Sequence, residues 1–279
     1  MGTSKTSRRK FLSTTLASTL AFTIIPRHVL GGKNFTAPSD RVRVASIGVG
    51  TQGSKHVEWF NSLSDVEVVA LCDVDKLRLE KCGAWLSSKN PEAKFETYTD
   101  FRKILDRKDI DAITCGTPDH WHALITVMAF ESGKDVYSEK PLCYNIAEGR
   151  AMLASLEKNK SVFQLGTQAR IGDNYPRVTE IVQSGKLGKI HTVRLWKGGG
   201  SPGLGFPANE TPPETLDWEM WQGPAPKQEY TRVRCHGSYR YFIEATWLQS
   251  ECLRGSFRKS NDPKGIYQHY ICRCCWNNN

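Results

Sequence analysis

Three glycines that follow an apolar run have the spacing of a loop that binds a dinucleotide. Gly48 would form the tight turn after a strand, Gly50 would let the main chain approach a pyrophosphate, and Gly53 would let the next helix pack against that strand. Thr51 and Gln52 would start a helix whose N-terminal N–H groups face the anion. We expect these five residues to bind a cofactor, although a plain tight turn between a strand and a helix can carry similar glycines.

An acidic residue lies at the distance from these glycines that a ribose partner requires. Asp73 ends a second apolar run, 20 residues after Gly53. Its carboxylate would accept hydrogen bonds from the adenosine ribose and would repel a 2′-phosphate, which favours NAD over NADP as the cofactor. Lys76 and Arg78 follow closely in the sequence and keep NADP open.

The tripeptide Glu139-Lys140-Pro141 could carry the proton transfer of a hydride reaction. Oxidation of an alcohol by a nicotinamide needs a group that takes the hydroxyl proton, and a lysine can do so near neutral pH when burial or positive charge lowers its pKa. We expect Lys140 to be this catalytic group, while Glu139 would hold Lys140 in place or contact the cofactor. Pro141 makes the turn rigid and could be cis. Taken alone, the tripeptide would also fit a surface turn with a salt bridge.

A third segment, Thr117-Pro118-Asp119-His120-Trp121-His122, ends one apolar run and begins a helical one. Pro118 would shape the turn and Asp119 is placed to cap the helix. Either histidine could act as an acid or a base, and we expect this loop to contact the nicotinamide half of the cofactor. Histidine and aspartate are also metal ligands. No further acid–histidine cluster completes a coordination set, so we expect no metal.

The order of apolar and helix-period segments predicts the fold class. Strand-like runs alternate with helical segments over short connections, which is typical of an α/β fold with a doubly wound parallel sheet of the Rossmann type. Ligands of such sheets bind beyond the C-terminal ends of the strands. The candidate residues at those ends are Gly48, Asp73, Thr117 and Glu139. The expected strands cover 42–47, 66–72, 112–115, 136–138 and 162–165, and the expected helices cover 53–63, 76–86, 101–105, 120–131 and 147–158.

The chain changes character after residue 166. We expect a helix over 175–183 and a strand with alternating faces over 190–196. Residues 198–223 are rich in glycine, proline and aromatic side chains. A loop of this kind commonly shapes a binding site, and it could equally pack against a partner subunit.

The charge distribution argues against a nucleic-acid partner. The chain has a net charge of +9, but residues 1–33 carry six Lys or Arg and no acid, and residues 245–279 carry five Lys or Arg and two acids. The body over 34–244 therefore has 27 basic and 27 acidic residues. Binding to nucleic acid needs a basic face on the folded domain, and a neutral body does not favour one.

The first 33 residues have the pattern of a twin-arginine export signal. Ser7-Arg8-Arg9-Lys10-Phe11-Leu12 precedes an uncharged run that ends at Pro26. This run is short and rich in Ser and Thr, unlike a transmembrane helix. We expect recognition by the twin-arginine export machinery and a periplasmic location, although an ordinary tail or a weak anchor would also fit. Because this route carries folded proteins, a tightly bound cofactor could travel with the protein.

These motifs together resemble the glucose–fructose oxidoreductase and inositol dehydrogenase (Gfo/Idh/MocA) family over residues 41–244. The shared motifs are Gly48-x-Gly50-x-x-Gly53, Asp73, Thr117-Pro118-Asp119-x-x-His122, Glu139-Lys140-Pro141-Leu142 and Gly166-Thr167-Gln168-x-Arg170. Gly185-x-x-Gly188 and Trp218-x-x-Trp221-x-Gly223-Pro224 resemble an exported subset of that family. The motifs are specific as a set and common singly.

The resemblance implies a fold, a substrate class and further residue roles. It implies a Rossmann domain over 41–165 and, over 166–244, part of a C-terminal α/β domain with an open, mainly antiparallel sheet that often serves oligomerisation. The family's substrates are mostly sugars, polyols and their derivatives. Lys140 would transfer the proton and contact the substrate, with His122 and Glu139 in the same catalytic group. Gln168 would lie near the cofactor and Arg170 near the substrate, at the domain junction.

The resemblance stops after Glu244. The family continues with a glycine-rich strand and an Asp-x-x-x-His element that supplies a second catalytic histidine, and residues 245–279 carry neither. This tail has no helical or strand period and holds four of the nine cysteines, in a spacing unlike that of a zinc module. We expect a disordered or frameshifted end, and therefore an incomplete second domain.

Three functions are compatible with these features. The favoured one is an NAD(P)-dependent oxidoreductase that transfers hydride between a tightly bound nicotinamide cofactor and a sugar-like alcohol. The second is an NAD-dependent glycosidase that uses transient oxidation and elimination. The third is a non-catalytic nucleotide-binding protein, which an incomplete second domain would favour.

Overall fold

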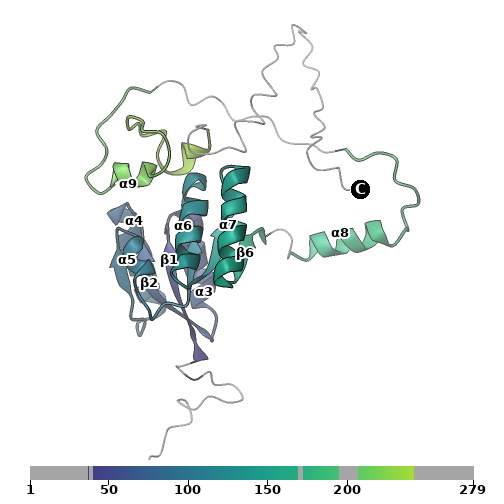
Figure 1. Ribbon diagram of the computed structural model, residues 1–279, viewed down its shortest axis with the longest axis horizontal. Coiled ribbons are helices and arrows are strands. Elements are labelled where there is room, and N and C mark those ends of the chain that lie inside the picture. The colour runs from purple at the N-terminus through teal and green to yellow at the C-terminus, as the bar shows by residue number, and fades with distance from the viewer. Residues whose placement is uncertain (1–36, 38–39, 169–171, 195–206, 242–279) are drawn as a thin grey trace, which may run out of the picture.

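Six parallel strands form one sheet at the centre of the protein (Figure 1). The computed structural model describes residues 37, 40–168, 172–194 and 207–241. The strands are β1 Val42–Ile47, β2 Val66–Cys72, β3 Glu96–Tyr98, β4 Ala112–Cys115, β5 Asp135–Glu139 and β6 Phe163–Gly166, in the order β3-β2-β1-β4-β5-β6. This is the strand order of the Rossmann fold. The predicted doubly wound parallel sheet is confirmed.

The register of the central strands brings the candidate residues to one edge of the sheet. Ile47, the last residue of β1, pairs with Cys72 at the end of β2 and with Cys115 at the end of β4. The chain therefore leaves all three strands at the same level. The glycine loop, Asp73 and the loop after β4 follow directly from these ends.

Helices cover both faces of the sheet. They are α3 Thr51–Asn61, α4 Lys76–Lys89, the short α5 Arg102–Leu105, α6 Asp119–Glu131 and α7 Ile146–Asn159. α6 and α7 lie side by side (Figure 1). Capping explains two of the starts, because Asp75 accepts a hydrogen bond from the Leu77 N–H and Asn145 accepts one from the Glu148 N–H.

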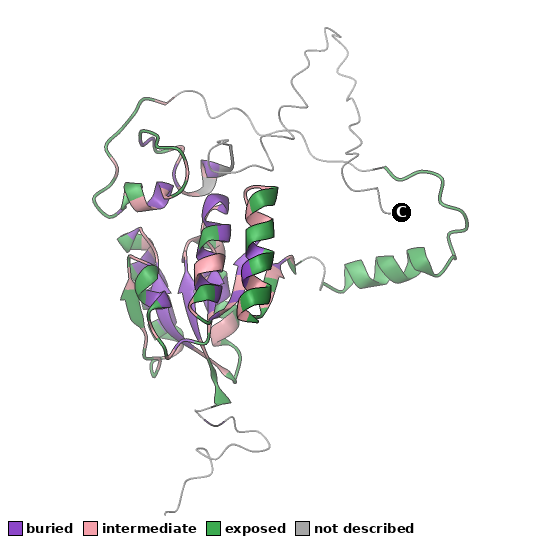
Figure 2. Ribbon diagram, viewed as in Figure 1, coloured by how far each residue is buried: buried purple, intermediate pink, exposed green. Residues whose placement is uncertain are grey.

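A buried apolar cluster within residues 216–239 is separate from two clusters that pack against the two faces of the sheet. One joins β1, β4 and β5 to α6 and includes Ile113, Ile125 and Phe130, while the other joins β2 to α3 and α4 and includes Val57 and Leu86. Most residues of β1, β2 and β4, which lie between these clusters, are buried (Figure 2). Burial on both faces is what a parallel sheet requires. These clusters hold the strand ends of the site in fixed positions.

The second half of the chain departs from the predicted strand. α8, Asn174–Gln183, forms as expected, but residues 190–194 are irregular and 195–196 lie outside the described residues. A strand requires a hydrogen-bonded neighbour, and the described residues place none beside 190–194. The expected antiparallel sheet is therefore not formed within the described part of the chain. The signal region 1–33 and the tail 245–279 also lie outside it.

Residues 207–241, which we call the aromatic segment, pack against the Rossmann domain. The segment contains α9, Trp218–Gln222, and a 3-10 helix, His236–Tyr241. Lys76 N–H donates to Thr215 O (2.9 Å) and Asp217 N–H donates to Val74 O (3.0 Å). These bonds attach the segment to the chain that follows β2. Among the helices of the described residues, none has both the length and the apolar character needed to cross a membrane.

Candidate functional site

The glycine loop has the geometry of a dinucleotide cradle. Gly48 has φ +78°, and a Cβ on Gly53 would lie 1.7 Å from Gly48 O, so neither position admits a side chain. Gly50 ends the loop, and a Cβ there would lie 2.3 Å from a guanidinium nitrogen of Arg78. α3 begins at Thr51, so the N–H groups of its first turn have no partner within the helix and can bind an anion at the loop. The residues present therefore fit a pyrophosphate, as the sequence predicts.

Asp73 faces this loop and keeps acceptor capacity for a ligand. Its Oδ2 accepts a hydrogen bond from the Val49 N–H (2.9 Å) and its Oδ1 accepts one from the Asp75 N–H (2.9 Å). A carboxylate can accept about four hydrogen bonds, so both oxygens can still accept from ribose hydroxyls. Burial raises the pKa of Asp73 to about 6, against the lowering effect of these two N–H groups and of Arg78.

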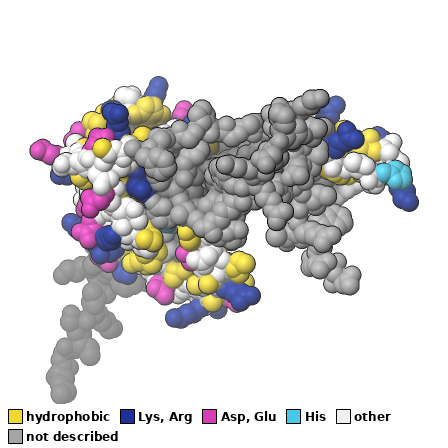
Figure 3. Space-filling view, turned by 90° about the horizontal axis from the view of Figure 1, so that it is seen from above, with side chains coloured by type: hydrophobic (Ala, Val, Ile, Leu, Met, Phe, Trp, Pro, Cys, Tyr) yellow, Lys and Arg dark blue, Asp and Glu magenta, His cyan; other side chains and the backbone are white. Residues whose placement is uncertain are grey.

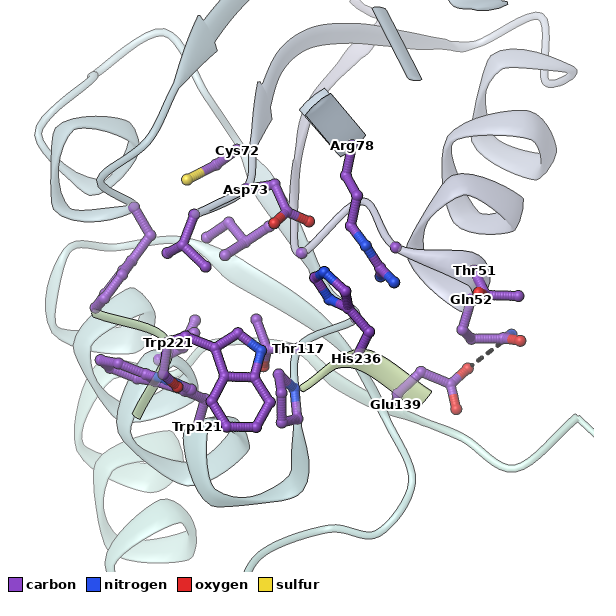
Figure 4. A pocket seen from close by; sticks show the side chains of 18 of the residues that line it. Thr51, Gln52, Cys72, Asp73, Arg78, Thr117, Trp121, Glu139, Trp221 and His236 are labelled. Atoms are coloured by element: carbon purple, nitrogen blue, oxygen red, sulfur yellow. Dashed lines mark hydrogen bonds between the residues drawn. The ribbon is translucent and has the colours of Figure 1, made fainter. Parts of the chain in front are cut away.

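A cavity of about 210 Å³ opens at the C-terminal ends of the strands (Figure 4). It is lined by ten of the residues that the sequence predicts as cofactor ligands: Gly48, Gly50, Thr51, Gln52, Asp73, Thr117, Pro118, Glu139, Lys140 and Gln168. Three other predicted ligands, Gly53, Asp119 and His122, do not line it. Arg170 lies outside the described residues.

Glu139 connects three parts of the site. Its Oε1 accepts from Gln52 Nε2 (3.1 Å) and from Gln168 Nε2, and it lies 3.0 Å from His56 Nε2. Its Oε2 accepts from the Lys140 N–H (3.2 Å). Burial alone would raise the pKa of Glu139, but the hydrogen bond and charge of His56, with the other donors, bring it below the ordinary value. Glu139 thus positions the turn that carries Lys140, one of the two roles that the sequence predicts.

Lys140 is exposed at the wall of the cavity, and its bond to Pro141 is cis. Lys140 follows Glu139, the last residue of β5, and so lies at the same sheet edge as the glycine loop. It can therefore reach a ligand held by that loop.

His122 is buried and holds two turns of the site together. Its Nε2 lies 2.9 Å from Thr117 O and its Nδ1 lies 2.7 Å from Pro141 O. Both ring nitrogens therefore face main-chain carbonyls, and neither faces the cavity. This geometry favours a positioning role over the predicted acid–base role, because the ring has no nitrogen left for a substrate.

Asp119 and His120 also differ from their predicted roles. Pro118, and not Asp119, is the N-cap of α6, and Asp119 Oδ1 accepts from the Tyr239 hydroxyl (3.2 Å). His120 Nε2 lies 3.1 Å from Trp221 O. These side chains therefore join α6 to the aromatic segment. The described residues contain no group of three or more His, Cys, Asp or Glu side chains placed to hold a metal ion.

Sequence reasoning missed several residues of the site. His56 could have been found, because it lies four residues after Gln52 on α3 and so shares its face. His236, whose Nε2 lies 3.0 Å from Asp75 Oδ2, could not, since tertiary packing alone brings it to the cavity. Trp221 lies in the 198–223 loop, for which the sequence offers a binding site as one of two roles, and it lines the cavity. Arg78, noted in the sequence only for NADP, lines the cavity as well.

Two family models match the chain. One is described as "Oxidoreductase family, NAD-binding Rossmann fold" and matches residues 42–167, and the other is described as "Oxidoreductase family, C-terminal alpha/beta domain" and matches residues 177–246. The chain belongs to the Gfo/Idh/MocA oxidoreductase family. The first part of this family member is therefore an NAD(P)-binding Rossmann domain, as the motifs predict.

The similar proteins include glycosyl hydrolases by name and inositol dehydrogenases by name. A glycosyl hydrolase family 109 protein from Shewanella sp. (strain W3-18-1) is 32% identical over 180 residues, which are 62% of this chain and 39% of that protein. The crystal structure of myo-inositol 2-dehydrogenase from Lactobacillus plantarum is 32% identical and covers 54% of this chain and 43% of its own, with a TM-score of 0.48. Scyllo-inositol dehydrogenase from Lactobacillus casei, with bound NAD(H) and scyllo-inositol, is 25% identical over 53% of this chain and 42% of its own, with a TM-score of 0.48. The chain spans about two fifths of the length of the first curated relatives that it matches.

Proposed function

We propose that this protein is an NAD(P)-dependent oxidoreductase that acts on a sugar or polyol, with Lys140 as the acid–base group. The observation that carries this proposal is the position of Lys140. It lies on the wall of the cofactor cavity, on a turn that Glu139 fixes from one side and His122 from the other. A group fixed in this way can be held within reach of a reacting hydroxyl.

Different residues of the chain bind the cofactor and transfer the proton. The glycine loop and the start of α3 bind the pyrophosphate, and Asp73 binds the adenosine ribose. When bound, the nicotinamide supplies hydride acceptance. Lys140 Nζ takes the proton of the substrate hydroxyl and returns it in the reverse direction. We infer NAD as the favoured cofactor because of Asp73. Arg78 beside Gly50 would suit a 2′-phosphate, so tighter binding of NADP than of NAD would contradict this choice.

The test compares turnover of the purified protein with that of a Lys140→Met variant. With a panel of sugars and polyols, we expect NADH formation by the parent protein and a loss of about a hundredfold or more in the variant, with NAD affinity kept. Lys158→Met, an exposed lysine on α7, is the matched control and should retain full turnover. Full turnover by the Lys140→Met protein would exclude the proposed role.

A second candidate is an NAD-dependent glycosidase. The names of the curated relatives favour it, because they are glycosyl hydrolase family 109 proteins. Such an activity would release the leaving group of an aryl glycoside without net NADH formation. Release of the aryl group together with constant absorbance of the cofactor would therefore favour this candidate. Cofactor binding with no turnover of either kind would support a nucleotide-binding protein without catalysis.

We also propose that the protein is exported with its cofactor held tightly. The twin arginines Arg8 and Arg9 and the residues of the aromatic segment that line the cavity support this proposal. Cell fractionation should place the protein in the periplasm, and a variant with both arginines changed to lysine should remain in the cytoplasm. Equal fractions of the two proteins outside the cytoplasm would contradict the export proposal.

A further inference from the structure

One wall of the cofactor cavity comes from outside the Rossmann domain. Met220, Trp221, His236 and Tyr239 of the aromatic segment line the same cavity as Asp73. Trp221 is only 6% exposed, although the segment carrying it has few regular elements. A large aromatic side chain at a cavity wall is a candidate for ligand contact.

The aromatic segment is held in place by the start of α6. Trp221 O accepts a hydrogen bond from Trp121 Nε1 (3.0 Å) and lies 3.1 Å from His120 Nε2. The next turn fits closely, because a Cβ on Gly223 would lie 1.9 Å from the Trp121 ring. Asp217 adds the N-cap of α9 by accepting from the Met220 N–H (2.9 Å). The side chains of Trp121, His120 and Asp217 therefore hold the main chain at Trp221 in place.

The cavity has two chemically different halves, and its aromatic side chains lie in one of them. Trp121 packs edge-to-face on Phe101 with ring centroids 5.5 Å apart, and Trp221 stacks on Trp218 with centroids 4.9 Å apart. Figure 4 shows Trp121 and Trp221 on one side of Asp73, and Gln52 with Glu139 on the other. One half of the cavity is thus flat and apolar, and the other is polar.

The position of Asp73 between these halves identifies what each half receives. If Asp73 binds the adenosine ribose, the base on that ribose must lie in one of the neighbouring halves. The polar half leads to Glu139 and Lys140, where the nicotinamide is expected, so the base goes to the aromatic half. A purine is flat and stacks well on indole rings.

We propose that Trp221 and Trp121 form the adenine site of the cofactor cavity, and that the aromatic segment is therefore part of cofactor binding. This proposal assigns Trp121 to the adenine, whereas the sequence predicts that its loop, 117–122, contacts the nicotinamide half. The Rossmann domain by itself supplies only one of the two tryptophans. The inference rests on the cofactor named in the proposed function but not on any turnover. A protein that binds the adenine as stated and fails to oxidise a sugar would leave this inference intact.

The test measures dissociation constants for NAD and for ADP-ribose, which is NAD without its nicotinamide ring. Trp221→Ala should weaken both ligands by a similar factor of about 10 to 100, as expected for loss of a stacking partner. Trp221→Phe should recover most of the affinity. Trp85→Ala, which removes a partly buried indole of α4 outside the cavity, is the control and should leave both constants unchanged.

A second measurement can be made on the unchanged protein. In the unchanged protein, intermolecular NOEs should link the adenine H2 and H8 protons to indole protons, and Trp221→Phe should remove a subset of them. Adenine NOEs to no tryptophan would overturn the proposal. An affinity loss in Trp221→Ala confined to NAD, with ADP-ribose binding unchanged, would also overturn it, because Trp221 would then contact the nicotinamide ring.

Discussion

At Asp73 one carboxylate has to serve the glycine loop and the expected ribose at once. The glycine loop supplies one N–H donor, from Val49, and the turn after β2 supplies another, from Asp75; both favour the ionised form. Burial acts in the other direction and raises the pKa of Asp73 to about 6. The ligand-free site is therefore close to protonation at mildly acidic pH, and ribose hydroxyls that donate to the carboxylate would favour ionisation again.

Cofactor affinity should consequently fall as the pH drops through about 6. The ionised carboxylate is the form that accepts from the ribose, so binding below this pKa must first remove a proton, and the association constant should fall by up to about tenfold per pH unit. Calorimetric titration with NAD between about pH 4.5 and 8 checks this. Asp73→Asn should bind more weakly and show a nearly flat profile over the same range. A parent profile that is equally flat would contradict the assignment.

At the scale of elements, the sequence predicts most strands of the Rossmann domain, but it does not predict the contacts of the aromatic segment with α6. Strands β1, β2 and β4 have the predicted bounds, because apolar runs between glycines and polar turns leave little freedom. β3 was missed, since three residues at the sheet edge have no apolar pattern. His120 and Asp119 contact residues of the aromatic segment that lie about a hundred positions later in the sequence, and no local sequence pattern predicts such contacts.

The turn after α9 offers a test of how the aromatic segment is attached. Gly223→Ala would add a Cβ 1.9 Å from the Trp121 ring at a residue with φ +50°, so α9 must move away from α6. We expect an unfolding free energy lower by about 2 to 4 kcal/mol and weaker NAD binding. Gly133→Ala is the matched control, because Gly133 has φ +74° but a Cβ there would meet nothing within 4 Å. For Gly133→Ala, urea unfolding should show an unfolding free energy lower by only about 1 kcal/mol, which is the cost of backbone strain. Equal losses in the two variants would mean that the contact with Trp121 is unimportant.

At the scale of the whole molecule, apolar surface remains uncovered beside a well-packed domain. Val178 is 58% exposed and Ile181 is 41% exposed on α8, and Ile146 on α7 is 69% exposed. α8 lies apart from the sheet in Figure 1, and Figure 3 shows hydrophobic and basic side chains together on the 172–194 segment. In the described residues these faces are therefore open to solvent.

Self-association at high concentration should follow from this exposed surface. Contiguous apolar patches promote association of proteins in water, so replacing two of these side chains by lysine, as Val178→Lys with Ile181→Lys, should reduce it without changing NAD affinity. Light scattering over a concentration series measures the first effect and calorimetry the second. Leu63→Lys, at an exposed apolar residue beyond the end of α3, is the control and should leave association as it was. If the control lowered association as much as the α8 variant, added charge and not the α8 face would be the cause. If the α8 variant lost NAD affinity, the helix would have to take part in the cofactor site, against the position of the cavity at the strand ends.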